Sequence, residues 1–453
     1  QLESPPMRAL MRALAPSSFE DVAALVALYR PGPMAANMHN DYADRKNNRK
    51  PVEYFHPDAE ELLRDTYGLM IYQESVMRVA QKFAGYTLAQ ADNLRKAMGK
   101  KIRSAMEKER ESFTSGMESM GYDTKLSEEV FEVISQFADY AFNKSHSYGY
   151  GLVAYQTAFL KAHYPVQYMA ALMTSVKGRK KEDSAIYLNE CRHMGLEVAV
   201  PDVNTAQMNY YPDIKSGNRS PRIVYGLSAI RNVGEGIVSL LISERNSNGP
   251  FVDFYDFCER VDMQVLNRRA LEALIKGGAF DGLGHTRQGL LGVYERIVEQ
   301  VVGRRRERDM GVMTLFDAPE ESETIFDEKI EIPEIEFEKS QRLAYEKEML
   351  GRYISEHPLG GYEQVLRRKC DFTSSSGSSF EEGKIVNAGG VVTDLQKKWT
   401  RRGELMASFT LEDLEGTVEV IVFTKVMAEI GHKINEDQPI LLTGRIDKRD
   451  DNV

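Results

Sequence analysis

The chain has 453 residues, of which 42% are hydrophobic and 28% are charged, and its formal net charge is −10. This length suffices for several domains, and the acidic balance excludes a surface coated with nucleic acid but not a local basic cleft. No apolar run approaches the roughly 18 residues of a membrane span, and no charged-then-apolar leader opens the chain. We therefore expect a cytoplasmic protein without a membrane partner.

The three cysteines, Cys191, Cys258 and Cys370, lie far apart and form no CxxC pattern. Their spacing indicates neither a disulfide framework nor a zinc site. Each is expected to be a small apolar residue that is buried or half-buried. No metal site is predicted in this chain.

The first 200 residues are predicted to be helical. Residues 1–30 indicate two short helices split at Pro16, with Ser17 or Ser18 as the cap of the second, before a rigid turn at 30–33. Residues 41–50 are polar and basic and are expected to form an exposed loop. Apolar residues then recur with a helical period over 58–83 and 125–139.

One stretch, Asn93–Arg110, is strongly positive in a chain that is acidic overall. It carries seven cations against only Glu107 and Glu109, so we expect it to bind an anion. The cations are Arg95, Lys96, Lys100, Lys101, Arg103, Lys108 and Arg110. The alternative is a solvated helix face.

A second helix is predicted from the residues after Phe142. Asn143 or Ser145 can cap it, and its first turn then presents Lys144, His146 and free backbone N–H groups, an arrangement that attracts phosphate. Chain order does not show that this turn faces the basic stretch. The alternative for His146 is a packing role.

Residues 225–300 contain two glycine pairs between helical segments. Gly234 and Gly236 flank a single residue, and glycine at such a hairpin lets the backbone approach a phosphate and tolerates positive φ. The second unit has Gly277 and Gly278 at its hairpin. Its cations are Arg268, Arg269 and Lys276. We interpret the region as a module that binds duplex DNA without base preference; the alternative is ordinary helix C-caps.

The C-terminal third begins with a basic cluster at 304–308 and an acidic linker at 317–338, on either side of the apolar island Val312–Phe316. A helix is predicted from Ser340 to near Glu356. The pattern over 384–447 is strand, strand, strand, helix, strand, which is typical of an OB-fold without its last strand.

The only tryptophan, Trp399, is expected in the loop between the first two of these strands. An aromatic ring among cations is typical of a surface that stacks on single-stranded bases. The neighbouring cations are Lys397, Lys398, Arg401 and Arg402. The alternative is a tryptophan packed against its own domain.

Five segments together resemble the bacterial C-family replicative DNA polymerases, in the family's order and spacing. The segments are RPGPM (30–34), YGLMIYQESVM (67–77), ADNLRKAMGKK (91–101), FNKSHSYGYGLVAYQTAFLKAHYP (142–165) and VYGLSAIRNVGEG (224–236). The resemblance extends over the whole chain and implies a multidomain α+β protein. The implied domains are the end of the palm and start of the fingers (1–30), fingers (31–200), a connecting segment (201–224), the helix-hairpin-helix module (225–300), a linker (301–340), a helical connector (341–383) and an incomplete OB-fold (384–453).

The resemblance implies template-directed DNA synthesis as the activity of the parent protein. It implies that Arg95 and His146 contact the incoming deoxynucleoside triphosphate (dNTP), and that Lys96 stands where relatives often have arginine and lacks the bidentate fork. Arg30, Lys100, Lys101 and Lys144 are expected as supporting phosphate contacts or salt-bridge partners. The carboxylates that hold two Mg²⁺ ions are expected N-terminal to this chain, so the chain alone should be inactive.

The implied partners are primer-template DNA, dNTP, the sliding clamp and other replisome subunits. The family's clamp-binding motif corresponds here to Val312, Met313, Thr314, Leu315 and Phe316, with valine in place of the usual glutamine. The alternative is a staple for the preceding helix. Two other functions stay open: a non-catalytic DNA-binding scaffold and an error-prone translesion paralogue.

Overall fold

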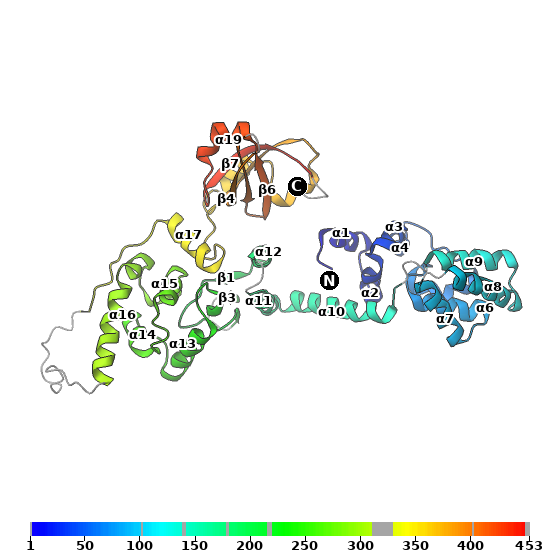
Figure 1. Cartoon of the computed structure of the whole chain (residues 1–453), viewed down its shortest axis with the longest axis horizontal. Coiled ribbons are helices and arrows are strands. Elements are labelled where there is room, and N and C mark those ends of the chain that lie inside the picture. Colours follow the sequence, from blue (N-terminus) through cyan, green and yellow to red (C-terminus); the bar gives the residue numbers. More distant parts are fainter. Residues whose placement is uncertain are drawn as a thin grey trace. The chain divides into compact units, whose positions relative to one another are not determined.

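The computed structural model describes residues 2–100, 103–137, 142–177, 181–214, 220–309, 329–400 and 403–448. It consists of two units, Gln1–Tyr164 and Pro165–Val453 (Figure 1). The first unit is helical, and the second combines helices with two small sheets. The predicted multidomain α+β class is confirmed.

The helices of the first unit are connected by short turns and 3₁₀ segments. They are α1 (Pro5–Leu14), α2 (Phe19–Leu28), α3 (Pro31–Ala35), α4 (Met38–Lys46), α5 (Glu60–Leu63), α6 (Gln73–Ala84), α7 (Leu88–Lys100), α8 (Arg103–Ser119), α9 (Thr124–Phe137) and α10 (Lys144–His163). Of the two predicted caps for α2, Ser18 is the one used, since its side chain accepts the Asp21 N–H.

One half of this unit packs α1, α2 and α4 around leucine and methionine side chains, and α10 runs along α2 (Figure 1). The close approach uses a glycine, because a Cβ on Gly151 would lie 3.0 Å from the Ala23 Cα. Beside it, the buried carboxylate of Asp21 accepts a hydrogen bond from Tyr42 and lies 3.6 Å from the Lys46 ammonium.

Two loop predictions in this half are wrong. The turn predicted at residues 30–33 is the start of α3, because proline suits the first position of a helix. The exposed loop predicted at 41–50 is helical as far as Lys46 and buries Tyr42 and Ala43. Two of its polar residues, Lys46 and Asn47, are not solvated as predicted, because they donate to the backbone carbonyls at the end of α1.

The other half of the unit is a bundle of α6, α7, α8 and α9 (Figure 1). Its core contains Val79, Phe83, Phe113, Phe131 and Ile134. Most of the apolar residues predicted over 58–83 and 125–139 pack in this core, whereas Tyr67 and Ile71 pack in the core of α1, α2 and α4. The first of these runs is not one helix, however, because the chain turns at Tyr67 and Gly68, which have φ of 52° and 80°.

The second unit opens with α11 (Pro165–Ser175), α12 (Lys181–His193) and a three-stranded sheet. The strands are β1 (Glu197–Ala199), β2 (Tyr211–Asp213) and β3 (Arg222–Val224), in the order β1-β3-β2. Both outer strands lie beside or contain a proline, Pro201 after β1 and Pro212 within β2, and proline is tolerated at a sheet edge because it lacks an N–H donor.

The next part of the unit is built around a phenylalanine-rich core, with Phe254, Phe257 and Phe280 in mutual contact. Its helices are α13 (Glu235–Asn248), α14 (Phe254–Arg260), α15 (Arg268–Lys276), α16 (Arg287–Asp309) and α17 (Lys339–Leu350). The same core includes Val203 and Ala206 from the segment before β3. The helix predicted to reach Glu356 ends at Leu350, because Gly351 adopts φ of 80°.

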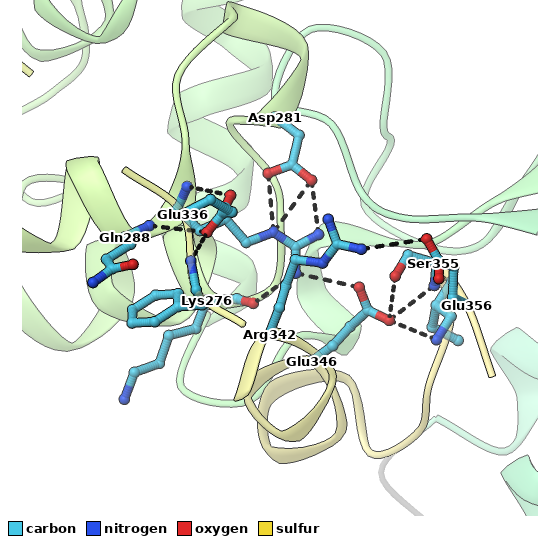
Figure 2. A network of polar contacts seen from close by, with 11 residues as sticks. Lys276, Asp281, Gln288, Glu336, Arg342, Glu346, Ser355 and Glu356 are labelled. Carbon is cyan, nitrogen blue, oxygen red and sulfur yellow. Dashed lines mark hydrogen bonds and ion pairs between the residues drawn. The ribbon is translucent and has the colours of Figure 1, made fainter. Parts of the chain in front are cut away.

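A buried ionic network fastens α17 to α16 (Figure 2). The Arg287 guanidinium donates to Asp281 at 2.7 Å and to Glu346 at 3.2 Å. The second oxygen of Glu346 accepts the N–H groups of Ile354 and Ser355, both at 2.8 Å. With Arg287 4% exposed and Glu346 fully buried, this pair lies out of reach of water.

The remaining sheet is antiparallel and curled, in the order β6-β5-β4-β7. Its strands are β4 (Ile385–Trp399), β5 (Leu405–Glu412), β6 (Thr417–Val422) and β7 (Pro439–Arg445), with α19 (Thr424–Ile430) between β6 and β7. The predicted order of strands and helix is confirmed. The short helix α18 (Glu363–Lys369) packs on β4, and Asp437 beside β7 accepts a hydrogen bond from Tyr353 at 2.5 Å.

None of the described helices is both long and apolar enough to cross a membrane.

We predict that Arg287→Leu destabilises the second unit by about 3 kcal/mol, because it leaves the fully buried carboxylate of Glu346 without its cation. Urea unfolding of the full chain measures the change. The control is Arg268→Leu, which removes an exposed guanidinium 2.9 Å from Glu295 and should cost less than about 1 kcal/mol. Equal effects of the two substitutions would contradict a special role for the buried pair.

Candidate functional site

Three of the predicted nucleotide-binding residues gather around the first turn of α10. Asn143 is the N-cap, and its Oδ1 accepts the His146 N–H at 2.9 Å. The His146 ring lies against Phe142, and the Arg30 guanidinium lies 4.4 Å from the centre of the same Phe142 ring. Arg30 and His146 are exposed. The structure therefore brings Arg30, Lys144 and His146 into one cationic cluster.

Two N–H groups in the first turn of α10 are already engaged within the protein. The carboxylate of Glu74, at the start of α6, accepts the Lys144 N–H at 2.9 Å and the Asn143 side-chain amide at 3.0 Å. The Asn143 side chain accepts the His146 N–H. The prediction of free N–H groups is corrected for Lys144 and His146.

The second cationic group lies on α7, where one carboxylate holds both predicted residues. Asp92 Oδ1 accepts from Arg95 at 2.7 Å, and Asp92 Oδ2 lies 2.7 Å from the Lys96 ammonium. Hydrogen bonds from Lys96 and Arg95 lower the pKa of Asp92 below its ordinary value. The Lys100 side chain and all of Lys101 lie outside the described residues.

Helix α6 connects these two cationic groups. The Gln73 N–H donates to the Phe142 carbonyl and the Phe142 N–H donates to the Ile71 carbonyl, both at 3.0 Å, so the starts of α6 and α10 are bound together. Farther along, α6 shares its apolar core with Ala91 and Leu94 of α7. Both cationic groups therefore belong to one framework, each with its own carboxylate.

The first predicted glycine hairpin lies on the surface at the start of α13. Gly234 is the N-cap with φ of −78°, and Gly236 lies in the first turn. Neither glycine has positive φ. The preceding element is a 3₁₀ segment, Leu227–Ala229, rather than an α-helix. A Cβ at either glycine would meet nothing within 4 Å, so the backbone here is open to a ligand.

The second predicted hairpin is filled by the protein itself. Gly277 and Gly278 are buried, and a Cβ on Gly278 would lie 2.2 Å from the Arg287 guanidinium. Gly278 does use positive φ, at 81°. Gly278 makes room for Arg287, and Gly277 is the C-cap of α15 beside Leu350, an arrangement that favours the C-cap alternative over an approach to DNA.

The cations assigned to the second hairpin differ in their surroundings. Lys276 lies 2.7 Å from Glu272, and its ammonium lies over the Tyr345 ring. Arg268 forms an exposed ion pair with Glu295. Arg269 is exposed. Of the three, Arg268 and Arg269 remain positioned for a ligand.

Trp399 projects from the rim of the antiparallel sheet. It is the last residue of β4 and pairs with Leu405, so the prediction that it lies in the loop is wrong by one position. Its side chain is 73% exposed, which excludes the alternative that it packs against its own domain within the described residues. Lys397 and Lys398 are exposed beside it. Arg401 and Arg402 lie outside the described residues, as do Val312–Phe316.

Four carboxylate and arginine residues that shape these sites were not predicted: Glu74, Asp92, Arg287 and Glu346. Asp92 could have been found, because it precedes Arg95 and Lys96 by three and four residues, the spacing of helical ion pairs. Glu74 and Lys144 are 70 residues apart along the chain, and Arg287 and Glu346 are 59 residues apart. No local pattern indicates such contacts.

Three regions of the chain match known families. Residues 1–121 match the bacterial DNA polymerase III alpha subunit finger domain, residues 195–290 a helix-hairpin-helix motif, and residues 386–453 an OB-fold nucleic acid binding domain. The DNA polymerase III subunit alpha of Mycobacterium tuberculosis (strain H37Rv) is 43% identical over 464 residues, covering 100% of this chain and 38% of the relative. The chain belongs to the bacterial DNA polymerase III alpha-subunit family.

Relatives from other bacteria give the same result. The DNA polymerase III subunit alpha of Haemophilus influenzae is 38% identical over 98% of this chain, and that of Vibrio cholerae is 36% identical over 100%. These matches cover 38% and 39% of the two relatives. The chain thus spans about two-fifths of the length of the DNA polymerase III alpha subunits that it matches, and the resemblance found in its motifs is confirmed.

The Mg²⁺ ions implied by the family do not fit the residues described here. Among them, no group of three or more His, Cys, Asp or Glu side chains is arranged to hold a metal ion. The nearest carboxylates to the predicted nucleotide site, Glu74 and Asp92, are engaged by backbone donors and cations. We derive no reaction step through a metal from these residues.

We predict that the double variant Gly234→Val and Gly236→Leu folds normally, because both sites are open and have negative φ. Its affinity for duplex DNA should fall about tenfold for all sequences alike, since the new side chains keep phosphates from the backbone. Fluorescence anisotropy with several unrelated duplexes measures this. The control is Gly292→Leu, at another open glycine, on α16. A loss confined to certain sequences, or none, would refute the hairpin assignment.

Proposed function

We propose that this chain is the fingers, helix-hairpin-helix and OB part of a replicative DNA polymerase that adds dNTP to a primer 3′-hydroxyl. The observation that carries the proposal is the identity of 36–43% with proteins named DNA polymerase III subunit alpha over essentially the whole chain. Inferred from the family, the parent protein acts at the nucleoid in the cytoplasm with other replisome subunits. The domain boundaries given above are part of the proposal.

In this function, the two cationic groups of the first unit hold the triphosphate. Arg95 contributes a planar guanidinium that can bind two phosphate oxygens at once, and Lys96 contributes a point charge. Arg30, Lys144 and His146 supply positive charge around the start of α10, with Lys100 and Lys101 as supporting cations. When bound to the parent enzyme, Mg²⁺ would activate the primer hydroxyl and neutralise the leaving pyrophosphate.

The second unit binds the DNA. The open backbone at Gly234 and Gly236 suits the duplex phosphates, with Arg268 and Arg269, exposed at the start of α15, as further cations. Trp399, with Lys397 and Lys398, forms a different kind of surface: an exposed ring beside positive charge stacks on bases irrespective of sequence. The duplex and the single-stranded template are therefore assigned to different parts of this unit.

We predict that the full chain binds dNTP, and that Arg95→Ala and His146→Ala each weaken the binding about tenfold by removing a charged or hydrogen-bonding contact to phosphate. Isothermal titration measures this. The control is Arg64→Ala, whose exposed guanidinium pairs with Glu60 at 3.3 Å outside the basic stretch. A non-catalytic scaffold needs no nucleotide, so absence of binding by the unaltered chain would favour that function.

We also propose that Val312–Phe316 binds the sliding clamp, chiefly through Leu315 and Phe316. This pentapeptide is apolar and lies between the basic cluster and the acidic linker in the sequence, a setting typical of motifs that dock into a partner's pocket. Valine in place of the family's glutamine removes polar contacts and leaves the two hydrophobic anchors.

We predict that a peptide of residues 308–318 binds the cognate clamp and that alanine at both Leu315 and Phe316 abolishes the binding. Val312→Gln should strengthen it about tenfold by restoring hydrogen bonds. Surface plasmon resonance measures the three affinities, with a scrambled peptide as control. Binding that is indifferent to the double alanine change would leave the staple role as the explanation.

A further inference from the structure

We infer that Glu74 is a positioning residue for the incoming nucleotide, because it fixes the turn that carries Lys144 and His146. The inference rests on the proposed function. Glu74 lies at the start of α6, is half-buried, and was not among the residues that the sequence singled out. Its role follows from the partners of its two carboxylate oxygens.

The two oxygens bind two different donors of one turn. Oε2 accepts the Lys144 N–H at 2.9 Å, and Oε1 accepts the Nδ2 group of Asn143 at 3.0 Å. An amide side chain has one donating and one accepting end. By engaging Nδ2, Glu74 directs Oδ1 of Asn143 toward the His146 N–H, which it meets at 2.9 Å. Glu74 thereby sets the cap of α10 as well as one backbone donor.

The cationic side chains are left available by this arrangement. The Lys144 ammonium lies 5.6 Å and 5.3 Å from the ring centres of Tyr72 and Tyr148, and the described structure has no ion pair between it and Glu74. His146 is exposed and contacts Phe142 and Tyr150 through its ring. The Glu74 carboxylate thus accepts hydrogen bonds from a backbone N–H and a side-chain amide at the N-terminal, positive end of α10.

Removing Glu74 should loosen the turn without detaching it. The backbone hydrogen bonds from Gln73 to Phe142 and from Phe142 to Ile71, both 3.0 Å, do not involve the Glu74 side chain. The start of α10 therefore stays beside α6, while the Asn143 cap and the turn after it lose their fixed orientation. A competing role makes the opposite prediction, because a carboxylate that merely excludes phosphate would raise affinity when removed.

The test titrates dTTP with Mg²⁺ into the full chain and its variants. Glu74→Ala should weaken binding about tenfold, the usual cost of a lost charge-assisted hydrogen bond. Glu74→Gln should recover part of the loss, because its oxygen still accepts the Lys144 N–H. Adding Asn143→Ala to Glu74→Ala should cause little further loss, since both residues act on one turn. In the complete polymerase, Glu74→Ala should raise KM for dNTP and leave kcat within about twofold.

The control is Asp123→Asn, which alters a carboxylate that accepts the Leu126 N–H at 2.7 Å at the start of α9. It should leave dTTP binding unchanged. Equal weakening by Asp123→Asn, unchanged binding by Glu74→Ala, or tighter binding by Glu74→Ala would each overturn the inference, the last by showing a competing anion. Failure of the unaltered chain to bind dTTP would overturn the nucleotide site itself, and the inference with it.

Discussion

The buried carboxylate of Glu346 is the constraint on which the arrangement of the second unit depends. A charge without water must have all of its oxygen sites satisfied, and Glu346 receives Arg287 on one side and the N–H groups of Ile354 and Ser355 on the other. This fixes α17 against α16 and also sets the path of the chain after α17. In the segment after α17, Tyr353 donates to Asp437 and Arg352 lies 3.5 Å from Glu412 of β5. These contacts connect the antiparallel sheet to the segment that Glu346 holds in place.

In the first unit, the cations of the candidate nucleotide site are exposed or half-buried. Asp92, on α7 itself, pairs with Arg95 and Lys96, and Glu74 of α6 accepts the Lys144 N–H at the start of α10. Exposed pairs of this kind contribute little to folding, so their main effect is on the direction in which side chains point. A site that must bind and release a highly charged ligand benefits from cations that are oriented before it arrives.

The sequence predicted the elements well where the apolar period was long and local. The helices around Phe83, Phe131 and Ile134 and the strand order of 384–447 follow directly from side-chain periodicity. The prediction from sequence failed where polar residues make tertiary contacts. Lys46 and Asn47 were predicted to be solvated but donate to the end of α1. The residues of the candidate sites were found through family resemblance, whereas Glu74 and Glu346, which orient their neighbours, depend on contacts between distant segments.

The two glycine pairs show why a motif alone does not determine a binding site. At Gly234 and Gly236 the missing side chains leave open space, and the backbone faces outward. At Gly278 the space left by the missing side chain is filled by the Arg287 guanidinium, which balances the charge of Glu346, and Gly277 packs beside Leu350. A glycine leaves space beside the backbone, and the charges around that space determine whether a phosphate or an arginine occupies it. In this chain, the buried carboxylate of Glu346 pairs with Arg287, and Arg287 occupies the space beside Gly278, so the second hairpin is part of the core.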